Sequence, residues 1–226
     1  MISFNPALHQ YSEDGVVLPS VTQVLHLAGL IDTSRHQSAN AEFGRRVHEV
    51  TAQLDRGEER ANDPDPRIGH RLVGWWLFRE TQEFKVLEIE KIVGGKELGY
   101  AGTCDRIVEQ NGEKWVVDLK TGSPCSWHQV QLAAYALAYG RPIKRMAVYL
   151  KPDCEVRFRE FKAESDFEDF RKALRFVVDQ QLEVARQAAL PRHGFLLGEE
   201  ILRLGGKDGL KAVNGGSRPL EIRVCR

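Results

Sequence analysis

The apolar positions of this chain follow two different periods, which predict a series of helices and strands. Apolar residues recur at helical spacing in five segments, near residues 20–30, 41–57, 67–83, 126–139 and 164–190. Alternating or continuously apolar runs predict strands in five others, near 86–93, 98–109, 113–120, 144–151 and 155–161. Residues before the first helix form short extended pieces, and Ser20 is the expected N-cap of that helix. The order predicts an α/β fold with a mixed sheet flanked by helices.

The turn Gln110-Asn111-Gly112 separates two predicted strands and therefore indicates an antiparallel hairpin. Ile107-Val108 and Val116-Val117 make both strands apolar on both sides, as is typical of buried central strands. We expect this hairpin to lie inside the sheet.

Polar residues interrupt these two strands at one end of the hairpin. Side chains alternate across a strand, so Asp118 and Lys120 share one face, whereas Val117 and Leu119 share the other. Asp105 lies on the first strand, and the hairpin brings it close to Asp118. Two carboxylates and a lysine are thus predicted at one end of the sheet.

These residue types suit metal-dependent cleavage of nucleic acid. A phosphodiester resists attack because its anionic oxygens repel a nucleophile, and a divalent cation both neutralises that charge and activates a water. Asp105 and Asp118 are candidate ligands for such a cation, with Lys120 as a fixed positive charge near the phosphate. The structural alternative is an exposed ion pair between Asp118 and Lys120, with Asp105 at a strand end. The apolar flanks favour the metal, because a buried carboxylate needs a compensating partner.

Two predicted helices carry further candidates. Gln131 and Tyr135 are four residues apart and share one face of helix 126–139, from which they could hold a substrate strand. His48, in helix 41–57, is a candidate third metal ligand. Each has an ordinary alternative, because a lone histidine is usually structural and a tyrosine on an amphipathic helix is usually part of the core.

Taken in order, His48, Gly102-x-x-Asp105, Asp118-x-Lys120 and Gln131-x-x-x-Tyr135 resemble the RecB-like branch of the PD-(D/E)xK nuclease superfamily. The similarity spans roughly residues 20–150, and the segment Leu18 to Leu25 also looks like the start of phage and bacterial exonucleases. The resemblance implies a restriction-endonuclease-like core, in which a mixed β-sheet is flanked by helices.

The resemblance also implies a cofactor and residue roles. It implies Mg²⁺ or Mn²⁺ bound by His48, Asp105, Asp118 and the backbone carbonyl of Leu119. Lys120 would assist the attack on phosphorus, and hydrolysis would leave 5′-phosphate products. Gln131 and Tyr135 would contact the substrate.

Residues beside these motifs are weaker candidates. Arg45, Arg46, Trp127 and His128 flank the predicted site and are candidate nucleic-acid contacts, although arginines on helices are ordinarily solvated. Glu90 shares the polar face of its predicted strand with Glu88, so it is either a solvated side chain or a supporting acid near the metal.

Trp75 and Trp76 are adjacent in helix 67–83, so their indoles cannot point in the same direction. We expect one in the core and the other exposed, where it could stack on an unpaired base.

The composition is that of a globular protein. Of its 226 residues, 42% are hydrophobic and 28% charged, and the length fits one full core. We expect a nuclease domain over residues 1–190 and a glycine-rich basic extension over 191–226. Nothing resembles a membrane span or a signal peptide, so we expect a cytoplasmic protein without a membrane partner.

The four cysteines, Cys104, Cys125, Cys154 and Cys225, are too widely spaced to form a Cys-x-x-Cys metal site. Reduced thiols are the expectation. Relatives with an iron–sulfur cluster group three of its cysteines near the C-terminus, so we expect no iron–sulfur cluster here.

The formal net charge is zero, which counts against tight duplex binding. Two segments of the chain are nevertheless locally basic, which offsets part of this objection. Residues 141–160 contain six basic and three acidic side chains, and residues 186–226 contain eight and four. Both segments could touch phosphate.

The sequence therefore predicts a Mg²⁺- or Mn²⁺-dependent deoxyribonuclease, with an exonuclease of recombination, repair or phage DNA metabolism favoured. DNA is the expected partner, with a single-strand annealing or other recombination protein as an open second one. Two alternatives stand beside this: a structure-specific endonuclease on the same core, and a catalytically silent nucleic-acid-binding module.

Overall fold

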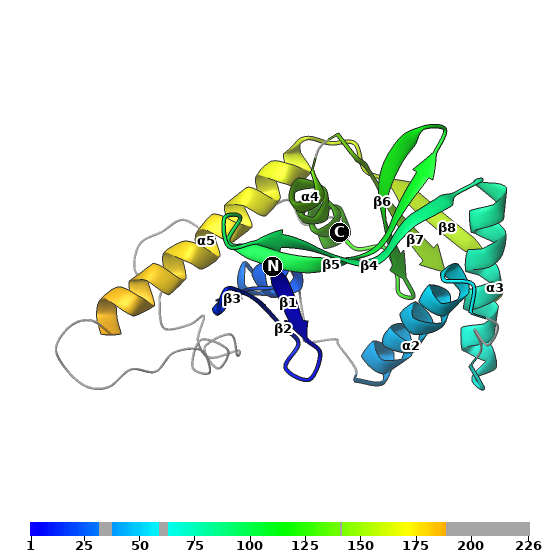
Figure 1. The fold of residues 1–226 in the computed structure, drawn as a ribbon, viewed down its shortest axis with the longest axis horizontal. Helices are drawn as coiled ribbons and strands as arrows, with labels where there is room; N and C mark the ends of the chain where they lie inside the picture. Colours follow the sequence, from blue (N-terminus) through cyan, green and yellow to red (C-terminus); the bar gives the residue numbers. More distant parts are fainter. Residues whose placement is uncertain (32–37, 59–62, 141, 189–226) are drawn as a thin grey trace.

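The computed structural model describes residues 1–31, 38–58, 63–140 and 142–188 (Figure 1). The predicted extension 191–226 and Cys225 lie outside these residues. Within these ranges no helix has both the length and the apolar character needed to cross a membrane.

A five-stranded sheet forms the centre of the molecule, with strand order β4-β5-β6-β7-β8. Its strands are β4 (Lys85–Gly95), β5 (Tyr100–Gln110), β6 (Glu113–Lys120), β7 (Lys144–Leu150) and β8 (Val156–Glu160). The β6–β7 pair is parallel, and the other three pairs are antiparallel. This is the predicted mixed sheet.

Helices cover both faces of this sheet, and their bounds are α1 (Val21–Leu27), α2 (Ser38–Asp55), α3 (Pro66–Thr81), α4 (Trp127–Tyr139) and α5 (Ser165–Ala188). Neighbouring residues of one strand enter different cores: Val116 packs with α1, α4 and α5, whereas Val117 packs with α2 and α3. Both valines are fully buried. The layered α/β architecture with a restriction-endonuclease-like sheet is therefore confirmed.

The N-terminal residues form a second, smaller sheet, where only short extended pieces were predicted. Its three antiparallel strands are β1 (Ile2–Asn5), β2 (Gln10–Glu13) and β3 (Val16–Leu18). It joins the main sheet through a bridge between Ser20 and Ala101 and a hydrogen bond of 2.7 Å between Tyr11 Oη and Thr103 Oγ1.

The first helix begins as predicted but ends earlier. Ser20 caps it, with its hydroxyl accepting from the backbone N–H of Gln23 at 3.0 Å. Gly29 adopts φ +75°, and the N–H groups of Gly29 and Leu30 bond back to the carbonyls of His26 and Leu25. This Schellman ending stops the helix at Leu27 and not at Leu30.

The hairpin β5–β6 is confirmed, and its two strands separate at one end. Asn111 and Gly112 both have positive φ, as a two-residue type I′ turn requires. The pairing runs to Arg106↔Val117, beyond which β5 continues beside β4 and β6 continues beside β7 (Figure 1). We call this divergence the fork.

Candidate active site

Three carboxylates lie side by side across the fork. The pairs Ile89↔Arg106 and Lys91↔Cys104 place Glu90 of β4 level with Asp105 of β5. By the register of the hairpin, Asp118 of β6 is level with Asp105 in turn. Asp105 and Asp118 are buried, at 7% and 3% exposure. The sheet thus concentrates negative charge where its strands part.

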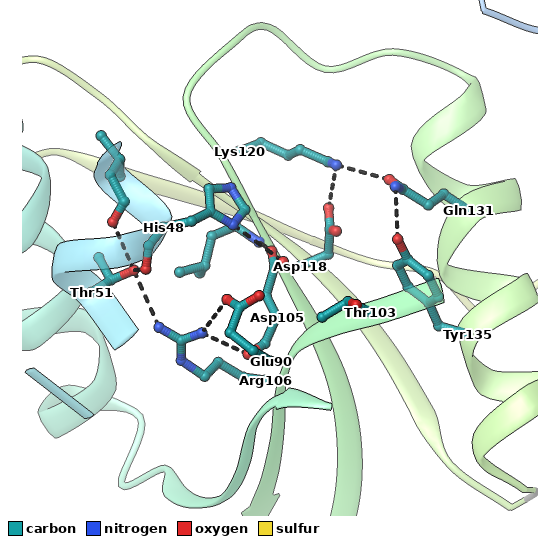
Figure 2. A network of polar contacts seen from close by, with 12 residues as sticks. His48, Thr51, Glu90, Thr103, Asp105, Arg106, Asp118, Lys120, Gln131 and Tyr135 are labelled. Carbon is teal, nitrogen blue, oxygen red and sulfur yellow. Dashed lines mark hydrogen bonds and ion pairs between the residues drawn. The ribbon is translucent and has the colours of Figure 1, made fainter. Parts of the chain in front are cut away.

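Helix α2 adds an imidazole to this row. His48 Nδ1 lies 3.2 Å from Asp105 Oδ1. Among the described residues, His48, Glu90 and Asp105 form a group whose ligand atoms all lie within 4.8 Å of one another (Figure 2). More than fifty residues separate His48 from the hairpin, and the fold closes that separation.

Lys120 and its partners complete the other side of the site. Lys120 Nζ lies 2.6 Å from Asp118 Oδ2 and donates to Gln131 Oε1 at 2.8 Å. The Gln131 amide in turn donates to Tyr135 Oη at 3.1 Å (Figure 2). This chain of contacts from α4 holds the lysine beside Asp118.

Backbone geometry supports the same residues. The N–H of Leu119 donates to Asp105 Oδ2 at 2.6 Å, so the carboxylate terminates the hairpin ladder at the fork. Gly102 has no space for a side chain, because a Cβ there would lie 2.7 Å from Tyr135 Cε1. The glycine thereby allows Tyr135 to pack against β5.

Burial and mutual repulsion shape the protonation of the site. Burial raises the pKa of Glu90 to about 7, with the charge of Asp105 adding to the rise. Burial also raises the pKa of Asp118 to about 6, although the charge of Lys120 opposes the rise. Burial opposes ionisation of Asp105 too, but His48, Lys120 and the Leu119 N–H outweigh it and lower the pKa of that carboxyl.

The pKa of His48 follows the same balance with the opposite sign. Burial lowers the pKa of His48, but the neighbouring carboxylates, Asp105 above all, raise it by more than burial lowers it. The net shift is therefore upward. The cluster therefore favours positive charge at its centre.

The donor set fits a divalent cation. An imidazole and carboxylate oxygens are ligands that Mn²⁺ accepts, and Mg²⁺ favours the oxygens. Burial is the main cause of the raised pKa values of Glu90 and Asp118, and the charge of Asp105 adds to both. A cation held by His48, Glu90 and Asp105 would supply positive charge that favours the ionised carboxylates. A hard cation bound at this site would stabilise the ionised form of its carboxylates.

Three predicted substrate contacts are buried. Gln131 and Tyr135 are 6% and 5% exposed and contact Lys120 and each other, so the structure places them behind the lysine. His128 is 3% exposed, and its Nδ1 contacts Tyr149 Oη at 3.0 Å and the Cys125 N–H at 3.3 Å. Burial lowers the pKa of His128 to about 3. The structure therefore gives His128 internal partners, and its contact with nucleic acid stays a prediction.

The other flanking residues remain accessible. Arg45 is exposed and pairs with Glu42 and Glu49 on its own helix, and Arg46 pairs with Asp63. Trp127 is half-buried, with Lys120 Nζ 5.0 Å from its ring centroid. These three side chains stay candidates for contact with substrate.

The predicted tryptophan pair divides as expected. Trp75 is fully buried, whereas Trp76 is 45% exposed. The Trp75 indole N–H donates to Asp55 at 2.9 Å.

The prediction that Glu88 and Glu90 share one polar face is wrong. Glu88 accepts a hydrogen bond of 2.9 Å from Tyr139 of α4 and pairs with Lys91, whereas Glu90 lies beside His48 of α2. Glu90 has φ +50°, and the register shifts between Val86 and Glu88, so simple alternation fails along β4.

Sequence reasoning also missed Arg106, whose guanidinium is completely buried beneath Glu90. An arginine beside Asp105 on an apolar strand is a signal that could have identified it, since a buried arginine requires partners.

A mixed α/β sheet with a carboxylate cluster at its fork defines a candidate metal-dependent enzyme. The family model described as the PD-(D/E)XK nuclease superfamily matches residues 65–195, which is more than half of the chain. The chain belongs to the PD-(D/E)XK nuclease superfamily. This membership indicates a metal-dependent nuclease, and the acidic cluster agrees with it.

No curated protein matches the chain significantly. The solved structure titled "Crystal structure of SSO0001" is 18% identical, with 59% of this chain and 70% of that chain covered and a TM-score of 0.30. A similarity of this strength carries no argument about activity.

Proposed function

We propose that this protein is a Mg²⁺- or Mn²⁺-dependent DNA exonuclease of the RecB-like branch of its superfamily. The observation that carries the proposal is the group His48, Glu90 and Asp105 directly beside the pair Asp118–Lys120. Its setting would be recombination, repair or phage DNA metabolism in the cytoplasm. Residues 1–190 would form the nuclease domain, with residues 191–226 as a basic extension.

The residues of the fork would bind the catalytic cation. His48, Asp105, Asp118 and the carbonyl of Leu119 would hold the cation, with Glu90 as an additional acid. The cation would neutralise the phosphate and lower the pKa of the attacking water. The other backbone group of Leu119, its N–H, donates to Asp105 and fixes that carboxylate.

Lys120 would place a positive charge next to the scissile phosphate. Asp118 and Gln131 restrain its ammonium group from two sides. A charge held in place before the reaction stabilises the transition state without reorganisation, which is the main source of electrostatic catalysis. Gln131 and Tyr135 would contribute by holding Lys120, which their hydrogen bonds support. Their contact with substrate stays a prediction.

Phosphate contacts would come from the accessible cations and the half-buried indole near the site. Arg45, Arg46 and Trp127 are the candidates. A preference for ends follows from the absence of an evident sequence-reading motif and from the family resemblance, so substrate selection would depend on shape and charge.

The test compares three substrates: end-labelled linear duplex, covalently closed circular duplex and linear single strand, each with Mg²⁺, Mn²⁺ or EDTA. We expect progressive loss of the linear substrates with either metal, none in EDTA, and intact circles. Efficient nicking of circles would establish the endonuclease alternative. Binding of all three without cleavage in either metal would establish the silent module.

A further inference from the structure

Arg106 has an unusual position for an arginine, since its side chain is 0% exposed directly beneath the candidate metal group. Its guanidinium is nevertheless well satisfied. Nε contacts Asp55 Oδ2 at 2.5 Å, and Nη1 donates to the backbone carbonyl of Asp105 at 2.6 Å. Nη2 donates to Thr51 Oγ1 at 3.2 Å, and Nη1 also reaches Glu90 Oε1 at 3.3 Å.

The rear of this guanidinium is anchored in the helical layer. The side chain of Asp55, at the end of α2, is also 0% exposed. Its carboxylate accepts from Arg79 at 2.7 Å and from the Trp75 indole at 2.9 Å, so three groups from α3 and β5 converge on it. The Thr51 hydroxyl donates to Val47 O at 2.9 Å, which leaves its oxygen free to accept from Arg106. Arg106 is therefore held in one orientation.

The front of the guanidinium faces Glu90, a candidate metal ligand whose backbone is strained. The backbone of Glu90 has φ +50°, a conformation that residues other than glycine adopt only when their surroundings enforce it. A carboxylate has two oxygens, so the contact with Arg106 uses one and leaves the other able to bind a cation. The positive charge of Arg106 also offsets repulsion between Glu90 and Asp105.

We propose that Arg106 is a positioning residue that fixes Glu90 as a metal ligand, with Asp55 and Thr51 as its anchors. The inference rests on the proposed function, in which this group binds the catalytic cation. Groups that orient metal ligands in this way typically contribute 10- to 100-fold to metal affinity. Arg106 would act through Glu90 and would not touch substrate.

The experiment measures binding of Mn²⁺ alone, by titration calorimetry without DNA, to the full chain. Arg106→Lys keeps the charge and loses the planar fork, so we expect the Mn²⁺ dissociation constant to rise roughly tenfold or more. In a Glu90→Ala background, the same Arg106→Lys change should leave the dissociation constant nearly unchanged, because its target is gone. An equal rise in both backgrounds would overturn the inference.

Loss of stability alone must be separated from loss of positioning. Asp166→Asn is the matched control, because it disrupts another buried arginine–carboxylate pair, in which Asp166 lies 3.0 Å from Arg145 Nη1 and neither residue belongs to the group His48, Glu90 and Asp105. It should lower the unfolding temperature and leave Mn²⁺ binding unchanged. If Arg106→Lys does not fold, Asp55→Asn weakens the anchor with little change of shape and should weaken Mn²⁺ binding in the same direction. Unchanged Mn²⁺ binding by a folded Asp55→Asn variant would overturn the inference.

The outcomes also separate this inference from the proposed function. If the wild-type protein degrades linear DNA while Arg106→Lys binds Mn²⁺ normally, the inference alone fails. If the wild-type protein binds Mn²⁺ with the expected dependence on Arg106 but cleaves no DNA, the proposed function alone fails.

Discussion

Replacing Gly102 with alanine tests whether the chain from Tyr135 to Lys120 positions the lysine. The new Cβ would lie 2.7 Å from Tyr135 Cε1 and 3.0 Å from Val21 Cγ2. Both neighbours are buried, at 5% and 1% exposure, so neither can turn outward into solvent. We expect the Tyr135 ring to shift and to carry Gln131 and the Lys120 ammonium with it.

The magnitude follows from overpacking. Forcing one methyl group into a packed core costs about 1–3 kcal/mol, and each kcal/mol lowers the melting temperature of a chain of this size by about 2–4 °C. We therefore expect Gly102→Ala to melt about 2–12 °C lower. Misplacement of a reacting group by about 1 Å can reduce the rate by about a hundredfold, so activity should fall by up to that factor even well below the melting temperature.

The assay pairs a thermal melt with the rate of linear-DNA degradation at saturating Mg²⁺. Gly69→Ala is the matched control, because a Cβ at this helical glycine meets nothing within 4 Å. It should leave the rate unchanged and stabilise slightly, as alanine generally does in a helix. A Gly102→Ala variant with wild-type melting temperature and rate would refute the reasoning.

Three further predictions concern single groups. Asp118→Asn and Lys120→Met should each reduce cleavage of linear DNA by roughly a hundredfold or more while the protein stays folded, and undiminished cleavage by either would remove the proposed site. The carboxylates around His48 raise its pKa, so protons compete more strongly with the cation as pH falls. The Mg²⁺ concentration for half-maximal rate should therefore rise between about pH 8 and about pH 6. His48→Ala should make that dependence shallower, and the remainder should come from Glu90 and Asp118, whose pKa values are raised to about 7 and about 6. Ser20→Ala, which loses the cap of α1, should cost about 1 kcal/mol in a denaturant titration without slowing cleavage.

Local patterns were enough to predict the frame of this fold. The turn at Asn111-Gly112, the doubly apolar strands beside it and the spacing of Gln131 and Tyr135 are each properties of a few consecutive residues. They identified the hairpin, the buried sheet and the helix face that meets Lys120. The early end of α1 was missed because the Schellman geometry at Gly29 depends on φ, and the apolar spacing continues to Leu30.

The missed part of the site depends on contacts between distant segments. Alternation assigned Glu90 to the same polar face as Glu88, and only the positive φ at Glu90 and the irregular register of β4 show why the two glutamates meet different helices. Arg106 presents the same problem: Asp55 is 51 residues away, and its partner role follows from α2 and α3 packing over β5. A buried charge can be expected from an apolar strand, but its partner cannot be chosen from the sequence alone, because several acidic residues could reach it. The network of Asp55, Arg106 and Glu90 is therefore a property of tertiary packing, and it ties the orientation of a candidate metal ligand to the docking of two helices.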